Sequence, residues 1–72
     1  MSNLPAHKIK LGLTTATIWD NDGNYSVDIT RSYKDAQGDW KNTGSLFHSD
    51  LLNVAKVAER AEIWISRQLS TR

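Results

Sequence analysis

Cysteine is absent from this chain of 72 residues, and proline occurs only once, at Pro5. Without cysteine the protein has neither disulfides nor thiolate metal sites. The two histidines, His7 and His48, lie far apart and have no carboxylate at ligand spacing, so we expect no structural metal. Chains this short are usually marginally stable unless disulfides, a metal or oligomerisation supports them. Homodimerisation is therefore the expected additional stabiliser.

Long apolar runs and a strong net charge are missing as well. No apolar stretch approaches the length of a membrane-spanning helix, and residues 1–7 lack the basic-then-apolar pattern of a signal peptide. We therefore expect a cytoplasmic protein without a membrane partner. The net charge is only +1, so a nucleic-acid partner would require positive charge to be segregated on one face.

Recognisable catalytic motifs are also lacking. The chain has no glycine-rich phosphate loop and no plausible pair of nucleophile and base, so we expect no enzymatic activity, no cofactor and no small-molecule substrate. Residues 20–24 resemble the start of a calcium loop, but the glycine comes too early and Arg31 stands where the closing glutamate belongs. The Asp-Gly pair at positions 22 and 23 instead predicts a hairpin turn.

The first two thirds of the chain favour β-strands. After a flexible lead-in (residues 1–6), alternating and β-branched segments predict strands over residues 7–13, 14–20, 25–34 and 39–47. The connections over 21–24 and 35–38 are rich in Asp, Asn and Gly, as tight turns are. Ile9, Leu11 and Leu13 are expected on one face of the first strand, and Val27 and Ile29 point inward on the third.

The remaining residues, 49–72, predict one long helix. Ser49 is the expected N-cap, Asp50 suits the first turn, and apolar residues then recur at steps of three and four. The fold class is therefore α+β: a four-stranded antiparallel sheet followed by one long helix that packs on one sheet face, in a single dimeric domain over residues 1–72. A helix this long overhangs the sheet, and its end needs a second surface. The expected dimer interface comprises Val57, Ala61, Ile63, Trp64 and Ile65.

The sheet face opposite the helix is the candidate binding surface. Alternation places four lysines there against one acid, Asp28, with hydroxyl side chains and an indole between them. Single-stranded nucleic acid needs cations for its phosphates and flat side chains for its bases. The same polar side chains also occur on ordinary solvated sheets. The candidate site comprises Lys8, Lys10, Thr17, Trp19, Thr30, Lys34 and Lys41, with Arg31, Tyr33 and Trp40 near the strand ends; Thr15, Ser32, Thr43 and Ser45 complete the expected face.

A series of short motifs runs from residue 20 into the helix. These are Gly23 in a turn, Val27-Asp28-Ile29 in a strand, the aromatic Tyr33, the acidic turn Asp35-Ala36-Gln37-Gly38-Asp39, Lys41, and Ser45-Leu46 before the helix. In this order they resemble the positive-cofactor-four family of single-stranded-DNA-binding transcriptional coactivators. The resemblance implies a homodimer that binds DNA across its sheets, with Tyr33 stacking on a base, Lys41 meeting a phosphate, and Lys8 and Lys10 supplying basic charge.

This chain departs from the family's pattern at three places that bear on the implied DNA contacts. Asn21 replaces the aromatic of the family's turn, although Trp19 could substitute for it. Trp19 itself stands where the family has an arginine. The lysine-rich loop is shortened to residues 41–44, and fewer cations predict weaker, more salt-sensitive binding.

Two functions from different classes follow from the sequence. The leading hypothesis is a homodimeric, non-enzymatic protein that binds single-stranded DNA, with RNA left open, and acts in transcription regulation, replication or repair. The alternative is a protein-interaction or assembly module, with Trp19 and Trp64 as anchors on the open sheet and the helix overhang.

Overall fold

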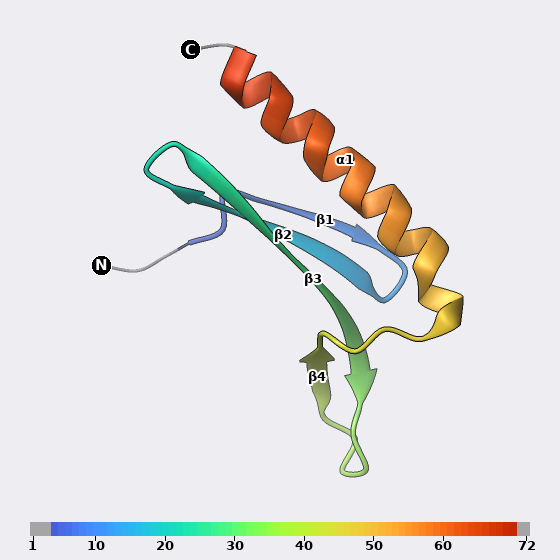
Figure 1. Cartoon of the computed structure of the whole chain (residues 1–72). Coiled ribbons are helices and arrows are strands. Elements are labelled where there is room, and N and C mark those ends of the chain that lie inside the picture. Colours follow the sequence, from blue (N-terminus) through green and yellow to red (C-terminus); the bar gives the residue numbers. More distant parts are fainter. Residues whose placement is uncertain (1–3, 71–72) are drawn as a thin grey trace.

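A computed structural model describes residues 4–70 of the chain. Four strands are followed by a short 3₁₀ turn and one helix, and the strands form a single antiparallel sheet in the order β1-β2-β3-β4 (Figure 1). The expected α+β fold is therefore confirmed. Residues 1–3 of the predicted lead-in and residues 71–72 of the predicted helix lie outside the described residues. The elements are β1 (His7–Leu11), β2 (Thr14–Asn21), β3 (Asn24–Lys34), β4 (Trp40–Thr43), η1 (His48–Asp50) and α1 (Leu51–Ser70).

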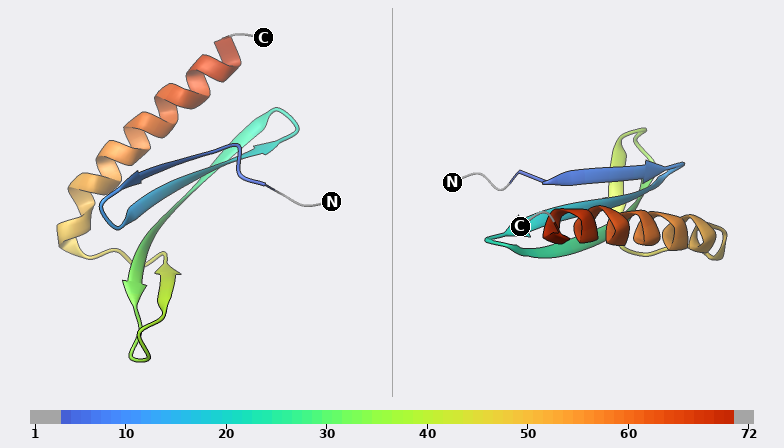
Figure 2. Two further views of the ribbon diagram at one scale, coloured as in Figure 1. Left: turned by 180° about the vertical axis from the view of Figure 1, so that it is seen from behind. Right: turned by 90° about the horizontal axis from the view of Figure 1, so that it is seen from above.

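The helix covers only part of one sheet face. It contacts β2 most extensively, then β1, and β3 least. Seen from above, α1 and the sheet form two layers, and the second sheet face carries no helix (Figure 2). The C-terminal part of β3 and its partner β4 project beyond α1 as a separate arm (Figure 1). None of the helices that the structure describes combines the length and the apolar character that crossing a membrane requires.

A small core joins β2 to α1. Ala16 and Ile18 on β2 pack against Val57 and Ala61 on α1, and all four are buried. On β2 these apolar side chains alternate with Thr15 and Thr17, because successive residues of a strand point to opposite faces. Thr15 and Thr17 therefore lie on the face opposite the helix, as the sequence predicts. Partly buried neighbours of this core are Ile9, Leu11, Tyr25, Ile29, Trp64 and Ile65.

Trp64 packs on the sheet of its own chain. Its indole stacks on the imidazole of His7, with ring centroids 5.0 Å apart, and meets Tyr25 edge-on at 5.8 Å. Trp64 is therefore half-buried against its own sheet, and its place in a dimer interface stays a prediction. Val57 and Ala61, at 0% and 2% exposure, have no surface to offer a partner, so their predicted place in the interface is wrong. Of the predicted interface residues, Ile65 is half-buried and Ile63 is 41% exposed.

The β2–β3 connection is the tight hairpin that the Asp-Gly pair predicts. Asp22 and Gly23 have φ angles of 57° and 95°, and the Gly23 N–H donates to the Asp20 carboxylate at 2.8 Å. Two successive positive φ angles are characteristic of the type I′ turn that suits twisted antiparallel strands. Among the described residues no group of three or more His, Cys, Asp or Glu side chains could hold a metal ion.

Two predicted strand ends are wrong. The first strand ends at Leu11, because Gly12 adopts a φ of 62° and turns the chain, so Leu13 lies in the turn. The fourth strand covers only Trp40–Thr43 rather than residues 39–47. Its partner β3 ends at Lys34, opposite Trp40, so the ladder between the two strands is short.

The predicted N-cap is also wrong. Ser49 lies inside η1, and the carboxylate of Asp50 reaches back to accept the Phe47 N–H at 2.8 Å. The Asp50 N–H donates to the Phe47 carbonyl at 2.9 Å, which closes the turn. Asp50 therefore acts as the local capping side chain.

Candidate functional site

The open sheet face contains a shallow polar hollow. Its volume is about 400 Å³, and its lining comes from all four strands. Cross-strand pairing produces this arrangement: Lys10 lies opposite Thr15, which lies opposite Thr30, and Lys8 is opposite Thr17. The structure thus brings Lys8, Lys10, Thr17 and Thr30 together as the sequence predicts. The complete lining is Lys8, Lys10, Thr15, Thr17, Thr30, Ser32 and Asn42.

A second hollow continues the first toward the β3–β4 arm. It has a volume of about 350 Å³ and shares Lys10 and Ser32 with its neighbour. Trp40, 62% exposed, and Leu13 complete its lining. The ammonium of Lys34 lies over the Trp40 ring, 5.7 Å from its centroid. The two hollows form one continuous surface that ends at an exposed indole with an adjacent cation.

Trp19 lies on the same face at the opposite end of β2. Its indole N–H donates to the Asp28 carboxylate at 3.1 Å, so a hydrogen bond sets the position of the ring. Asp28 is the only acid predicted on this face, and one of its oxygens is occupied by this bond. The indole therefore has a defined orientation and is half-buried.

The lysines of the open face have no carboxylate partners within the described part of the chain. Its two salt bridges join Arg31 to Asp50 and Lys41 to Asp35, and neither involves Lys8, Lys10 or Lys34. An exposed cation without a counter-charge attracts anions from solution, and this attraction weakens as salt is added. The hollow therefore carries two lysines whose charge no carboxylate of the described residues neutralises.

Arg31 does not belong to this surface. It lies opposite Thr14, whose side chain is buried in the helix-covered face. The Arg31 Nε lies 3.1 and 3.0 Å from the two oxygens of Asp50, and its guanidinium lies 4.8 Å from the Phe47 ring centroid. Arg31 therefore links β3 to the start of the helix. The prediction that Arg31 belongs to the nucleic-acid site on the open face is wrong.

Lys41 also lies on the other face, because its neighbour Asn42 occupies the open one. The Lys41 ammonium lies 3.2 Å from Asp35, within the β3–β4 turn. The backbone N–H of Asp39, followed by Lys41 and the N–H groups of Gln37 and Gly38, lowers the pKa of the half-buried Asp35 carboxyl. The prediction that Lys41 and Thr43 face outward with Lys8 and Lys10 is therefore wrong.

Tyr33 lies away from the open face too. It is opposite Lys41 and lines a mostly apolar cleft of about 290 Å³ with Arg31, Thr43, Ser45 and Phe47. The base-stacking role that the family resemblance implies for Tyr33 would therefore require a different face from the one that carries Lys8 and Lys10.

Sequence reasoning missed two residues of the open surface, Asn42 and Leu13. Asn42 accepts a hydrogen bond from Ser32 at 3.1 Å, which places it beside the hollow. Leu13 accepts the Ser32 N–H through its carbonyl at 2.9 Å. Strand alternation could identify neither, because Leu13 lies in a turn and the face of Asn42 depends on the register that the β3–β4 turn sets.

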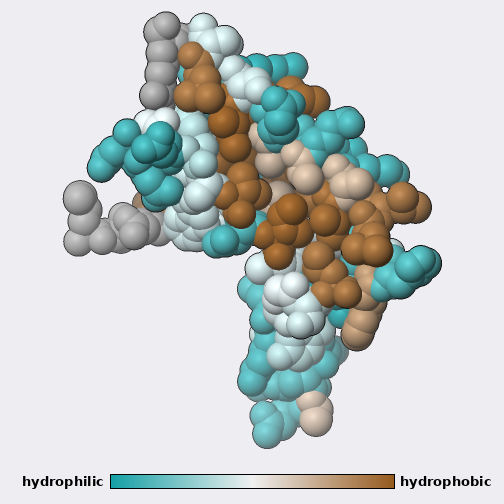
Figure 3. Space-filling model, in the orientation of Figure 1, coloured by the Kyte–Doolittle hydropathy of each residue, from teal (hydrophilic) through white to brown (hydrophobic). Residues whose placement is uncertain are grey.

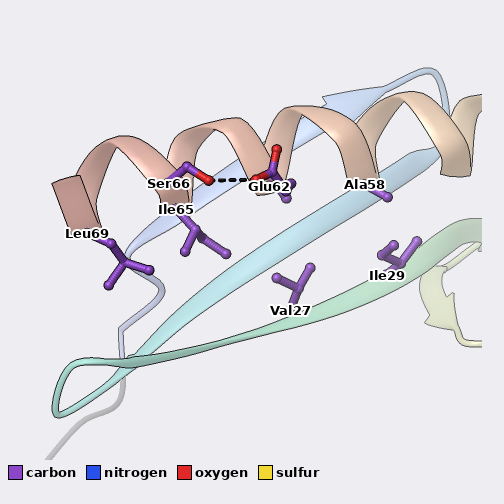
Figure 4. A pocket seen from close by; sticks show the side chains of 8 residues that line it. Val27, Ile29, Ala58, Glu62, Ile65, Ser66 and Leu69 are labelled. Carbon is purple, nitrogen blue, oxygen red and sulfur yellow. Dashed lines mark hydrogen bonds between the residues drawn. The ribbon is translucent and has the colours of Figure 1, made fainter.

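An apolar groove lies on the helix side of the molecule, between β3 and α1. Its volume is about 490 Å³, and Figure 4 shows Val27 and Ile29 projecting from β3 toward the helix. The helix contributes Ala58, Ile65 and Leu69, while Ser66 donates a hydrogen bond to Glu62 at 2.6 Å beside the groove. Hydrophobic surface is visible along this junction in Figure 3.

Comparison of the chain with protein-family models, with curated proteins and with solved structures found no match.

Proposed function

We propose that this protein is a homodimer that binds single-stranded DNA on the open face of its sheet. The observation that carries the proposal is the continuous hollow, lined by unpaired Lys8 and Lys10 and by hydroxyl groups, with Trp19 and Trp40 on the same face. Such a surface combines the two components that sequence-tolerant binding of a single strand requires, cations and stacking side chains.

The proposed binding combines contacts to the DNA backbone with contacts to the DNA bases. Lys8, Lys10 and Lys34 neutralise phosphates and release the counterions condensed on them. The indoles of Trp19 and Trp40 stack on bases, a contact available to every base because each has a π-face. The threonine and serine hydroxyls between them donate hydrogen bonds to phosphate and sugar oxygens. The protein thus carries out no covalent chemistry, and its activity is to hold a strand in single-stranded form.

The resemblance to the positive-cofactor-four family supports this proposal through the order of elements and the basic first strand. Its implied contacts at Tyr33 and Lys41 receive no such support, because both side chains lie on the helix side of the arm. In this chain Trp19 and Trp40 take the stacking role instead. We propose that it acts in the cytoplasm, in transcription regulation, replication or repair.

The homodimer is supported by the uncovered groove between β3 and α1. The chain exposes 5393 Å² of surface, whereas a compact monomer of 8.1 kDa exposes about 4,500 Å². The difference is close to the area of about 800 Å² that each partner contributes to a standard interface. A second copy seated against Val27, Ile29, Ala58, Ile65 and Leu69 would cover the apolar side chains that the single helix leaves exposed.

Fluorescence anisotropy with a labelled oligo-dT of about 20 nucleotides tests the DNA-binding proposal. We expect binding at low salt, with log K falling against log salt by about 0.7 for each phosphate neutralised. The double substitution of Lys8→Gln and Lys10→Gln should reduce that slope by about 1.4. Lys56→Gln is the matched control, because Lys56 is exposed on α1 and its loss changes the charge without touching the open face. Absent or salt-insensitive binding, or an equal loss in the control, would refute the proposal.

A further inference from the structure

We propose that one chain holds about five nucleotides along β3, with bases stacked at the two ends by Trp19 and Trp40. This inference rests on the proposed function and specifies the length and the anchoring points of the strand bound at that site. It derives from the register of the sheet, which sets the side chains of the open face in successive rows.

The rows follow from the cross-strand pairs. Trp19 lies opposite Ser26 at one end, and Trp40 lies opposite Lys34 at the other. Between them, every second residue of β3 faces the open side of the sheet. Each of these residues forms one row with the residues paired to it on the adjacent strands. The five rows are Trp19 with Ser26; Lys8 with Thr17 and Asp28; Lys10 with Thr15 and Thr30; Leu13 with Ser32 and Asn42; and Trp40 with Lys34.

The spacing of these rows matches that of an extended strand of DNA. Two residues of a β-strand advance by about 6.6 Å. A stacked DNA strand advances by about 3.4 Å per nucleotide, and an unstacked, extended strand by roughly twice that distance. One row therefore corresponds to one nucleotide. The path from the row of Trp19 to the row of Trp40 covers eight residues of β3, or about 26 Å along the strand.

The side chains of the rows hold the bound DNA strand by base stacking at its two ends and accept any base at its centre. Aromatic side chains occur only in the two terminal rows, and the lysines of the second and third rows have no carboxylate partner in the described residues. The central nucleotides therefore meet cations, hydroxyls and an amide, which contact phosphates and sugars, while the terminal bases meet indoles.

The local contacts prepare both indoles for this role. The hydrogen bond from Trp19 to Asp28 holds the first ring in one orientation, so little conformational entropy is lost when a base stacks on it. The Lys34 ammonium, 5.7 Å from the centroid of the Trp40 ring, lies where it can meet the phosphate of a nucleotide stacked there.

The length of the bound strand is tested by anisotropy with oligo-dT of three, five and eight nucleotides at one low salt concentration. Three nucleotides reach one tryptophan and five reach both, so we expect affinity to rise by about 5- to 150-fold between these two lengths. Extension from five to eight adds no further tryptophan and should change affinity by less than about fivefold.

The anchoring points are tested by removing single bases from the five-nucleotide strand. An abasic site at either end should weaken binding by about 5- to 150-fold, and an abasic site at the centre should weaken it far less. In the Trp40→Ala variant, one of the two terminal abasic sites should cause no further loss, because its stacking partner is already gone. Trp40 is 62% exposed, so its replacement leaves the fold intact, and Lys34→Gln in the same row is the control that removes charge but keeps the ring.

The outcomes separate this inference from the proposed function. Equal losses from central and terminal abasic sites, or a steady rise of affinity up to eight nucleotides, would overturn the footprint while oligo-dT binding stands. Failure of strands of every length, including the longer oligo-dT, to bind would overturn both. In Trp40→Ala, the affinity loss caused by a terminal abasic site should disappear at one end of the DNA only. That result would establish both tryptophans as anchors and show in which direction the DNA lies along β3.

Discussion

At the scale of single residues, the arginine of β3 illustrates how one side chain can be misassigned on charge alone. Arg31 has the charge expected of a phosphate contact, yet its guanidinium pairs with Asp50, which is only 7% exposed. Asp50 in turn accepts the Phe47 N–H. The pair therefore connects the end of the sheet to the start of the helix, and its role is structural.

Replacing Arg31 should accordingly change stability rather than DNA binding. Arg31→Met removes the partner of a buried carboxylate and should lower the free energy of unfolding by about 1–3 kcal/mol, measured by urea denaturation. Arg60→Met on the exposed face of α1 is the matched control and should be nearly neutral. A loss of oligo-dT affinity without a loss of stability would show that Arg31 belongs to the binding surface after all.

The sequence alone is sufficient to predict which sheet face Arg31 and Tyr33 occupy. Both have the same parity as Val27 and Ile29, and strand alternation alone assigns all four to the helix side. The sequence alone does not predict which sheet face Lys41 occupies. That face depends on the five residues between β3 and β4, which pair Ser32 with Asn42 and so turn Lys41 away from the open face. A one-residue change in such a connection reverses the face of every following side chain.

At the scale of elements, the β2–β3 hairpin depends on backbone conformation. Gly23→Ala places a side chain at a φ of 95° and should destabilise the protein by about 1–2 kcal/mol, measured by thermal or urea denaturation. Gly44→Ala provides the control, since Gly44 lacks a positive φ and a Cβ there would meet no atom within 4 Å. Equal effects of the two substitutions would contradict this account of the turn.

The β3–β4 turn should respond to acid. Hydrogen bonds from the Asp39 N–H, Lys41 and neighbouring N–H groups lower the pKa of the Asp35 carboxyl below its ordinary value in the folded turn. The resulting stabilisation is present above the unfolded-state pKa and is lost as the pH falls through the folded-state value. NMR titration of the Asp35 carboxyl carbon should show this lowered pKa, and Lys41→Gln should raise it. A midpoint at or above the ordinary value in the wild-type protein would contradict the assignment.

Sequence patterns predicted the elements better than their contacts. Alternation and the Asp-Gly pair identify β1 to β3 and the hairpin because these signals are local. The position of α1 over β1 and β2, with β3 left partly bare, depends on long-range packing of Trp64 between His7 and Tyr25. No local pattern specifies that placement, so Val57 and Ala61 were assigned to a dimer interface although they lie in the core of the chain.

At the scale of the whole molecule, the chain forms a thin plate with extents of 46 × 32 × 15 Å. Each broad face presents a different surface: a polar hollow on one side and a partly covered apolar groove on the other. This division allows the two parts of the proposed function, DNA binding and dimerisation, to use separate surfaces.

The groove should be the dimer contact. Ala58→Glu introduces a charge into the groove at an exposed helical position, and should shift the mass measured by light scattering from twice 8.1 kDa toward 8.1 kDa. Leu52→Glu introduces the same group at a 77% exposed helical position outside the groove lining and should leave the dimer intact. A wild-type protein that is monomeric at all concentrations, or equal dissociation of both variants, would contradict the dimer contact.

The most direct test of the central claim is an NMR titration of the protein with oligo-dT that follows the indole N–H signals. The chain has three tryptophans, and the structure places Trp19 and Trp40 on the open face and Trp64 on the helix side. We predict that the Trp19 and Trp40 signals shift with increasing DNA while the Trp64 signal stays in place. No shift of any indole signal, or a shift of Trp64 alone, would contradict binding of single-stranded DNA on the open sheet face.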